Sequence, residues 1–154
     1  MLWLLLEEES GPLPPLSLIA TDISQEYLDI AVSGIYGYHG IKEIPENYLE
    51  RFFRYEQGRY FIAEDLKQNI SWHLHDLTDA PPLNGPFQII FLRNNLLTYC
   101  KKEFHEGPVS RLTEALTAGG YLIIGACETM LVDEQKLSRL DDYFGIFQKQ
   151  WLQI

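Results

Sequence analysis

Two charged residues follow short apolar segments of the length typical of buried strands. Asp22 comes after the apolar run 16–20, and Arg93 comes after the run 87–92. The Asp22 carboxylate can accept hydrogen bonds from the two vicinal hydroxyls of a ribose, as in dinucleotide-binding folds; an acid near a helix N-cap is the alternative, and the two are about even. The Arg93 guanidinium requires an anion, either a ligand carboxylate or an internal salt bridge.

Other kinds of chemistry have little support in the sequence. His73 and His75 lie two residues apart, so one strand face could present both to a metal. No third ligand is evident near them, which favours a solvated strand face, and we predict no metal site. The sequence contains no Gly-x-Ser-x-Gly elbow, no Cys/His catalytic pattern and no phosphate-binding loop, so hydrolase and kinase functions are not indicated.

The composition restricts the partners. The 154 residues contain 12 Lys and Arg against 22 Asp and Glu, a net charge of −10, which argues against binding nucleic acid or anionic lipid. The apolar run 1–6 is too short to span a bilayer, so no membrane insertion is expected. Cys100 and Cys127 are the only cysteines, too few for a disulfide framework, and this favours a cytoplasmic location.

Apolar periodicity predicts alternating helices and strands. We expect helices over 1–9, from the Ser24 cap through Ala31, over 45–53 and over 101–117, and a short helix near Leu137. We expect strands over 16–20, 59–63, 70–74, 87–92 and 121–124, and an edge strand over 144–148. This order indicates an α/β layered sheet that is parallel in its centre. Ligands of such sheets bind beyond the carboxyl ends of the strands.

The segments at these strand ends resemble, in order and spacing over residues 16–130, the CheR-type chemotaxis receptor methyltransferases. The matching segments are Ala20-Thr21-Asp22-Ile23-Ser24, Ser33-Gly34-Ile35-Tyr36, Tyr48-Leu49-Glu50-Arg51-Phe52-Phe53, Leu66-Lys67 before Ile70-Ser71-Trp72, Asn84-Gly85-Pro86-Phe87 continuing to Arg93-Asn94, and Leu116-Thr117-Ala118-Gly119-Gly120 continuing to Gly125.

The resemblance implies a Rossmann-like class I methyltransferase sheet. Residues 1–154 would form a partial methyltransferase domain, with a small antiparallel β-subdomain inserted at 55–70 that grips a receptor tail. The cofactor would be S-adenosylmethionine, with S-adenosylhomocysteine as product, and the substrate a chemoreceptor or another protein methylated on glutamate carboxylates.

The resemblance also implies site residues. Asp22 corresponds to the acid on the cofactor ribose, and Asp76-Leu77 to an Asn-Leu pair beside the adenine; an Asp there accepts but cannot donate as Asn can. Arg93 corresponds to a strand-end arginine in the cofactor and substrate pocket. A tyrosine near that arginine would fall at Thr98, one position before Tyr99, and either residue could point inward.

The family has a first strand with a Gly-rich turn that this sequence lacks; that strand is central, between the strands ending at Asp22 and Arg93. We therefore expect an incomplete sheet and impaired methyl transfer. Three explanations are open: the chain is a fragment, the two flanking strands pair directly, or a second copy contributes and the chain self-associates. The alternative function is a non-catalytic protein-binding module that has lost the cofactor site.

Overall fold

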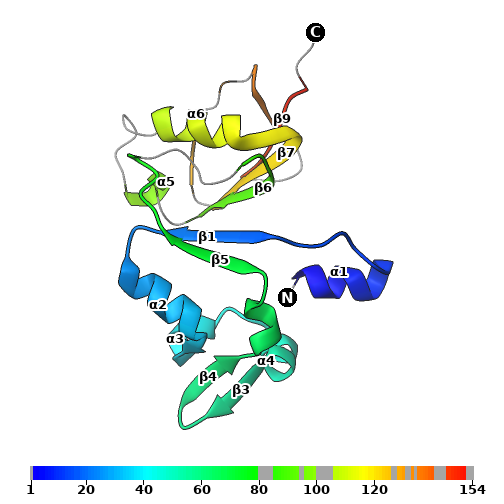
Figure 1. Cartoon of the computed structure of the whole chain (residues 1–154), viewed down its shortest axis with the longest axis vertical. Coiled ribbons are helices and arrows are strands. Elements are labelled where there is room, and N and C mark those ends of the chain that lie inside the picture. The colour runs from blue at the N-terminus through cyan, green and yellow to red at the C-terminus, as the bar shows by residue number, and fades with distance from the viewer. Residues whose placement is uncertain are drawn as a thin grey trace. The chain divides into compact units, whose positions relative to one another are not determined.

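The computed structural model describes residues 2–79, 85–93, 96–99, 106–125, 128–130, 133, 135–140 and 145–151. The chain forms two compact units, residues 1–75 and 76–154, each of which is shown in Figure 1. No helix in the described ranges has the length and apolar character needed to cross a membrane.

The first unit contains two small sheets and five helical segments. Its strands are β1 (Leu18–Asp22), β2 (Ile35–Tyr36), β3 (Phe53–Glu56), β4 (Arg59–Ile62) and β5 (Ile70–Leu74). Its helices are α1 (Leu2–Ser10), α2 (Gln25–Ser33), α3 (Tyr38–Ile41), α4 (Glu46–Phe52) and the 3₁₀ segment η1 (Glu64–Lys67).

The β1–β5 sheet is parallel, and its register runs from Leu18 opposite Ile70 to Asp22 opposite Leu74. The helix α2 connects β1 to the rest of this unit and packs against both strands, with Leu28 buried. Parallel strands require such a crossover, because a tight turn can join only antiparallel neighbours. The strand register therefore places Asp22 and the last residue of β5, Leu74, at the same end of this sheet.

The second sheet of this unit is antiparallel, in the order β2-β4-β3. The β3–β4 hairpin turns at Gln57 and Gly58, both with positive φ (49° and 78°), a conformation that matches the twist of the two strands. The Tyr55 and Tyr60 rings lie 4.8 Å apart across the hairpin. The hairpin thus lies mostly within the range 55–70, and the sheet also takes in β2.

The second unit is built on one four-stranded sheet. Its elements are β6 (Phe87–Leu92), α5 (Leu96–Tyr99), α6 (Glu106–Ala115), β7 (Leu116–Ile124), β8 (Leu137–Arg139) and β9 (Ile146–Lys149), with strand order β6-β7-β9-β8. The β6–β7 pair is parallel and the other two pairs are antiparallel. Helix α6 lies along one face of this sheet (Figure 1), and Val109 and Leu112 pack there into one core with Leu92 and Leu122.

Most predicted elements are confirmed, and three predictions are wrong. The segment at Leu137 is a strand, not a helix, and the segment at 146–149 is an interior strand between β7 and β8, not an edge strand. The predicted helix 101–117 ends at Ala115, because Leu116 already pairs with Phe87. Residues 101–105 and 144 lie outside the described residues.

The two parallel pairs belong to separate sheets. Among the described strands, β1 pairs only with β5, and β6 pairs only with β7 and no strand on its other side. Direct pairing of β1 with β6, one of the three expected arrangements, is therefore not observed in this part of the chain. Each of the two strands keeps one edge whose backbone groups have no described strand partner.

Candidate functional site

Asp22 ends β1 and shapes the turn into α2. One of its carboxylate oxygens accepts a hydrogen bond from the backbone N–H of Ser24 at 2.8 Å. Its carbonyl oxygen accepts from the backbone N–H of His75 at 2.9 Å, just beyond β5. No group in the described part of the chain donates to the second carboxylate oxygen of Asp22. The structural role near the N-cap is therefore observed, and acceptor capacity for a ribose hydroxyl is left over.

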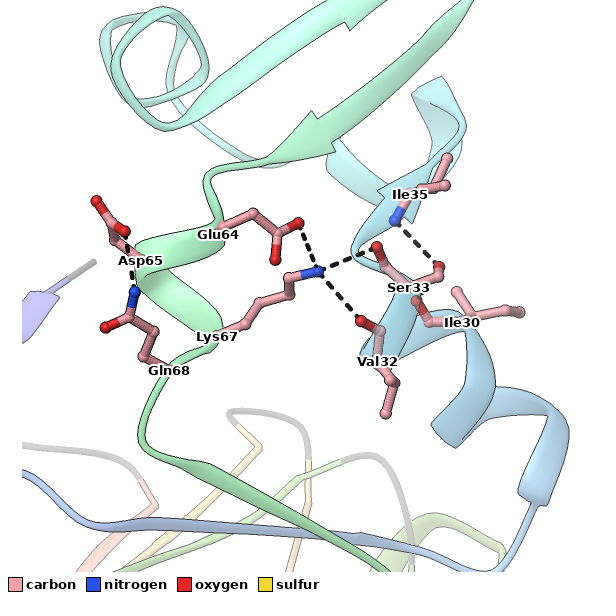
Figure 2. Close-up of polar contacts among 8 residues, drawn as sticks. All are labelled: Ile30, Val32, Ser33, Ile35, Glu64, Asp65, Lys67 and Gln68. Atoms are coloured by element: carbon pink, nitrogen blue, oxygen red, sulfur yellow. Dashed lines mark hydrogen bonds and ion pairs between the residues drawn. The ribbon is translucent and has the colours of Figure 1, made fainter.

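The helix that follows Asp22 is fixed at both ends. At its start, the Ser24 hydroxyl accepts from the Tyr27 N–H at 3.4 Å. At its end, as Figure 2 shows, the Lys67 ammonium group donates to the carbonyls of Val32 and Ser33, each at 3.3 Å. These carbonyls have no partner within the helix, and a cation there also interacts favourably with the helix dipole. The helix after the predicted ribose acid is thus held in place by a residue from η1.

The chain directly after β5 forms a tight turn closed by its own first residue. One Asp76 carboxylate oxygen accepts from both the backbone N–H and the hydroxyl of Thr78, at 2.8 and 2.7 Å. The Asp76 carbonyl accepts from the N–H of Asp79 at 3.3 Å. From α6, Arg111 Nη2 donates to the carbonyls of Leu77 and Thr78, at 2.7 and 2.9 Å. The carbonyls of Asp76, Leu77 and Thr78 are therefore all occupied.

The N–H of Leu77 is a backbone donor of this turn that has no described acceptor. Among the described residues, nothing accepts a hydrogen bond from the N–H of Leu77. An N–H donor next to the Asp76 carboxylate is complementary to the edge of adenine, which offers an acceptor at N1 and a donor at its amino group. The turn after β5 thus offers one backbone donor and one side-chain acceptor, which are the group types that the edge of adenine complements.

A second group of polar residues lies where β6 and β7 end. The two strands are parallel with Leu92 opposite Ile124, so Arg93 and Gly125 begin adjacent loops at the same edge. Arg93 is exposed, and no carboxylate among the described residues forms an ion pair with it. The internal salt bridge that would have explained this arginine is thus not seen in the described ranges.

Glu128 connects the two loops at this edge. One of its carboxylate oxygens accepts from the Thr98 hydroxyl on α5 at 2.5 Å, and the other accepts from the Gly125 N–H at 2.6 Å. The Thr98 hydroxyl therefore donates to a protein carboxylate. Tyr99 is the last residue of α5, and its side chain lies outside the described residues.

The predicted residues fall into two sets. Asp76, Leu77, Arg93 and Thr98 belong to the second unit, whereas Asp22 ends a strand of the first, and its convergence with the others stays a prediction. Sequence reasoning assigned no role to Arg111 or Glu128. Glu128 lies in a strand-end segment, which was a usable signal; Arg111 lies within a helix and gave none.

Parallel strands joined by helices, with polar groups at their carboxyl ends, are typical of α/β proteins, which bind ligands at those ends. The family described as "CheR methyltransferase, SAM binding domain" matches residues 2–144. The chain therefore belongs to the CheR methyltransferase family, whose S-adenosylmethionine-binding domain has the class I methyltransferase fold. Its cofactor is S-adenosylmethionine.

Individual proteins with similar sequences include chemotaxis protein methyltransferases. A chemotaxis protein methyltransferase of Vibrio parahaemolyticus is 31% identical over 137 residues, which cover 86% of this chain and 50% of the relative. Chemotaxis protein methyltransferase 1 of Vibrio cholerae matches with the same identity and coverage. An uncharacterized 104.1 kDa protein of Rhodobacter capsulatus is 30% identical over 141 residues, 92% of this chain but 15% of that protein. The chain thus spans half or less of these relatives.

Taken one unit at a time, the described residues carry polar groups of the types that this cofactor requires. Its ribose hydroxyls require acceptors, and Asp22 retains a carboxylate oxygen without a described donor. Its adenine requires an acceptor and a donor, which Asp76 and the Leu77 N–H supply by type. Its methionine carboxylate requires a cation, and Arg93 is exposed without a described carboxylate partner.

Proposed function

We propose that this chain is the cofactor-binding part of an S-adenosylmethionine-dependent methyltransferase that methylates glutamate carboxylates of chemoreceptors or related proteins. The observation that carries the proposal is the turn after β5, where the Leu77 N–H and the Asp76 carboxylate supply the donor and acceptor that adenine requires. Membership of a family that binds this cofactor supports the same assignment. The small number of cysteines supports a cytoplasmic setting.

In this proposal, the residues of the chain bind and align the reactants. The bound cofactor supplies a sulfonium methyl group that is already electrophilic. Asp22 holds the ribose, and Arg93 binds a carboxylate of the cofactor or of the methyl acceptor. No strong base is needed, because a glutamate side chain is already ionised at neutral pH. Alignment is then the main contribution, and well-oriented reactants gain up to about 7–11 kcal/mol over free ones.

We extend the proposal to the protein partner through the β3–β4 hairpin. In the sheet order β2-β4-β3, β3 is the edge strand, and its outer backbone groups have no strand partner among the described residues. Tyr55 on this strand is 64% exposed, and Arg54 lies over the Phe61 ring at 5.1 Å. An edge of this kind can bind an extended peptide by adding a strand, which suits the tail of a receptor.

A second function is favoured by the absence of a described strand ladder between the two parallel pairs, β1–β5 and β6–β7. Because no described ladder joins β1 to β6, the chain could keep the hairpin as a protein-binding surface without a complete cofactor site. Such a module would bind a receptor tail and would not bind S-adenosylhomocysteine. The two functions therefore differ in whether the chain binds S-adenosylhomocysteine.

Calorimetric titration of this chain with S-adenosylhomocysteine separates them. We expect saturable binding, and Asp22→Asn should weaken it about 10- to 100-fold, since a hydrogen bond to a charged acceptor contributes about 1.5–3 kcal/mol. The control is Asp29→Asn, which removes an exposed carboxylate on α2 that bonds only Gln25 among the described residues. Absence of heat at high micromolar ligand would eliminate the enzyme function for this chain. Equal affinities of the wild-type chain and Asp22→Asn would remove Asp22 from the ribose site.

A further inference from the structure

Arg111 makes contacts that neither the sequence pattern nor the family assignment explains. It lies on α6, whose inner side is fixed in the core by Val109 and Leu112, each at most 6% exposed. From this rigid base its Nη2 reaches 33 and 34 residues back in the chain, to the carbonyls of Thr78 and Leu77. A helix residue thus determines where two consecutive peptide groups of the turn after β5 lie.

The rest of the guanidinium supports this interpretation. Arg111 Nε is buried and has no hydrogen-bond partner among the described residues, and no described carboxylate forms an ion pair with the side chain. An unpaired buried donor is unfavourable. The described hydrogen bonds of the Arg111 side chain are thus the two that it donates to the Leu77 and Thr78 carbonyls.

Holding these carbonyls has a consequence for the neighbouring donors. The Leu77 and Thr78 carbonyls are bound to Arg111 and the Thr78 N–H is bound to Asp76, whereas the N–H of Leu77 has no acceptor among the described residues and can donate to a ligand. That N–H belongs to the Asp76–Leu77 peptide group, whose carbonyl is bound by the Asp79 N–H and which directly precedes the two peptide groups that Arg111 holds. Loss of the arginine would let those two groups rotate, and the Leu77 N–H and the Asp76 carboxylate would no longer be fixed relative to each other.

We propose that Arg111 is a positioning residue for base recognition, and that it makes the site selective for adenine over hypoxanthine. This inference rests on the proposed cofactor-binding function. Adenine presents an acceptor at N1 and a donor at its amino group, which the Leu77 N–H and the Asp76 carboxylate complement. Hypoxanthine presents a donor at N1 and an acceptor at O6, so that each contact would face a group of the same kind.

The test compares two ligands on the whole chain. S-adenosylhomocysteine and its hypoxanthine analogue, S-inosylhomocysteine, are titrated by calorimetry into the wild-type chain, Arg111→Lys, Arg111→Gln and the control Lys136→Gln. The control removes a positive charge from a half-exposed side chain of the same unit, 4.0 Å from Asp133. The ratio of the two affinities is the readout, because a general loss of folded protein lowers both affinities equally and leaves their ratio unchanged.

We expect the wild-type chain and the control to prefer the adenine ligand by at least about tenfold, since buried polar groups left unpaired strongly disfavour the wrong ligand. In both Arg111 variants the ratio should fall by at least about threefold. An unchanged ratio in these variants would overturn the positioning role while leaving cofactor binding intact. If Arg111→Gln does not fold, the affinity ratio of Arg111→Lys tests the positioning role, because this variant keeps the charge and the aliphatic stem. If the wild-type chain bound neither ligand, the proposed function would fail, and this inference with it.

Discussion

Replacing Lys67 by Met tests how the chain holds the helix that follows Asp22. The Lys67 side chain is only 19% exposed and its ammonium group lies between the Val32 and Ser33 carbonyls, with the Glu64 carboxylate 2.9 Å away. Met has a similar volume and no donor, so the substitution removes the polar contacts and keeps most of the packing. The two helix carbonyls would lose the partner that the structure gives them.

The size of the effect follows from these contacts. A hydrogen bond from a charged donor contributes about 1.5–3 kcal/mol. Both distances are 3.3 Å, beyond the usual range, so each bond should contribute about 1 kcal/mol. Charge at the helix terminus adds about 0.3–1 kcal/mol. The ion pair contributes little, because the Glu64 side chain is 81% exposed. We expect Lys67→Met to lower the free energy of unfolding by about 2–3 kcal/mol.

Thermal unfolding followed by circular dichroism measures this loss. For a chain of this length, it corresponds to a fall in Tm of about 5–10 °C. The matched control is Lys42→Met: the Lys42 side chain is 52% exposed, with Glu43 3.7 Å away and 89% exposed, and it should cost less than about 0.5 kcal/mol. A change as small as this for Lys67→Met would refute the argument that Lys67 anchors α2.

Three further measurements test other parts of the structure. Gly34→Ala should destabilise the chain by more than about 1–2 kcal/mol in urea unfolding, because φ is +66° and the added methyl group would lie 2.6 Å from Ile62. Burial raises the pKa of Tyr36, and the charge of Lys67 partly opposes this. Because the folded state holds the phenolic proton more tightly than the unfolded state, the free energy of unfolding should fall as pH rises above about 10. Tyr36→Phe should make this decrease smaller. Static light scattering should show self-association at high concentration, since β1 and β6 each have an edge without a described strand partner, and a strictly monomeric mass would contradict this.

The elements with strong apolar periodicity could be predicted from the sequence. The runs that form β1 and β6 are short and mostly apolar, the run that forms β5 alternates between apolar and polar residues, and Ser24 caps α2 as expected. These features depend on residues close together in the chain. They also place Asp22 and Arg93 at strand ends, so the sequence alone predicts both as candidate site residues.

The errors come from elements that depend on partners far away in the chain. Leu116 and Thr117 continue a helical pattern, yet Leu116 pairs with Phe87 and so begins β7. The strand at 137–139 has three residues and exists because it pairs with β9, which itself pairs with β7. No local pattern in so short a segment separates a strand from a helical turn. The four-residue α5 was missed for the same reason.

The candidate site shows a further limit, because part of its chemistry belongs to the backbone. Asp76 can be selected from the sequence as an acceptor, but the donor next to it is a peptide N–H that every residue except proline has. What distinguishes the Leu77 N–H is that it has no described acceptor, whereas the Leu77 and Thr78 carbonyls are bound by Arg111 and the Thr78 N–H is bound by Asp76. Selectivity for a base would thus depend on which backbone groups have no hydrogen-bond partner within the fold. An arginine within α6 can therefore influence recognition at a turn more than thirty residues earlier, without touching the ligand.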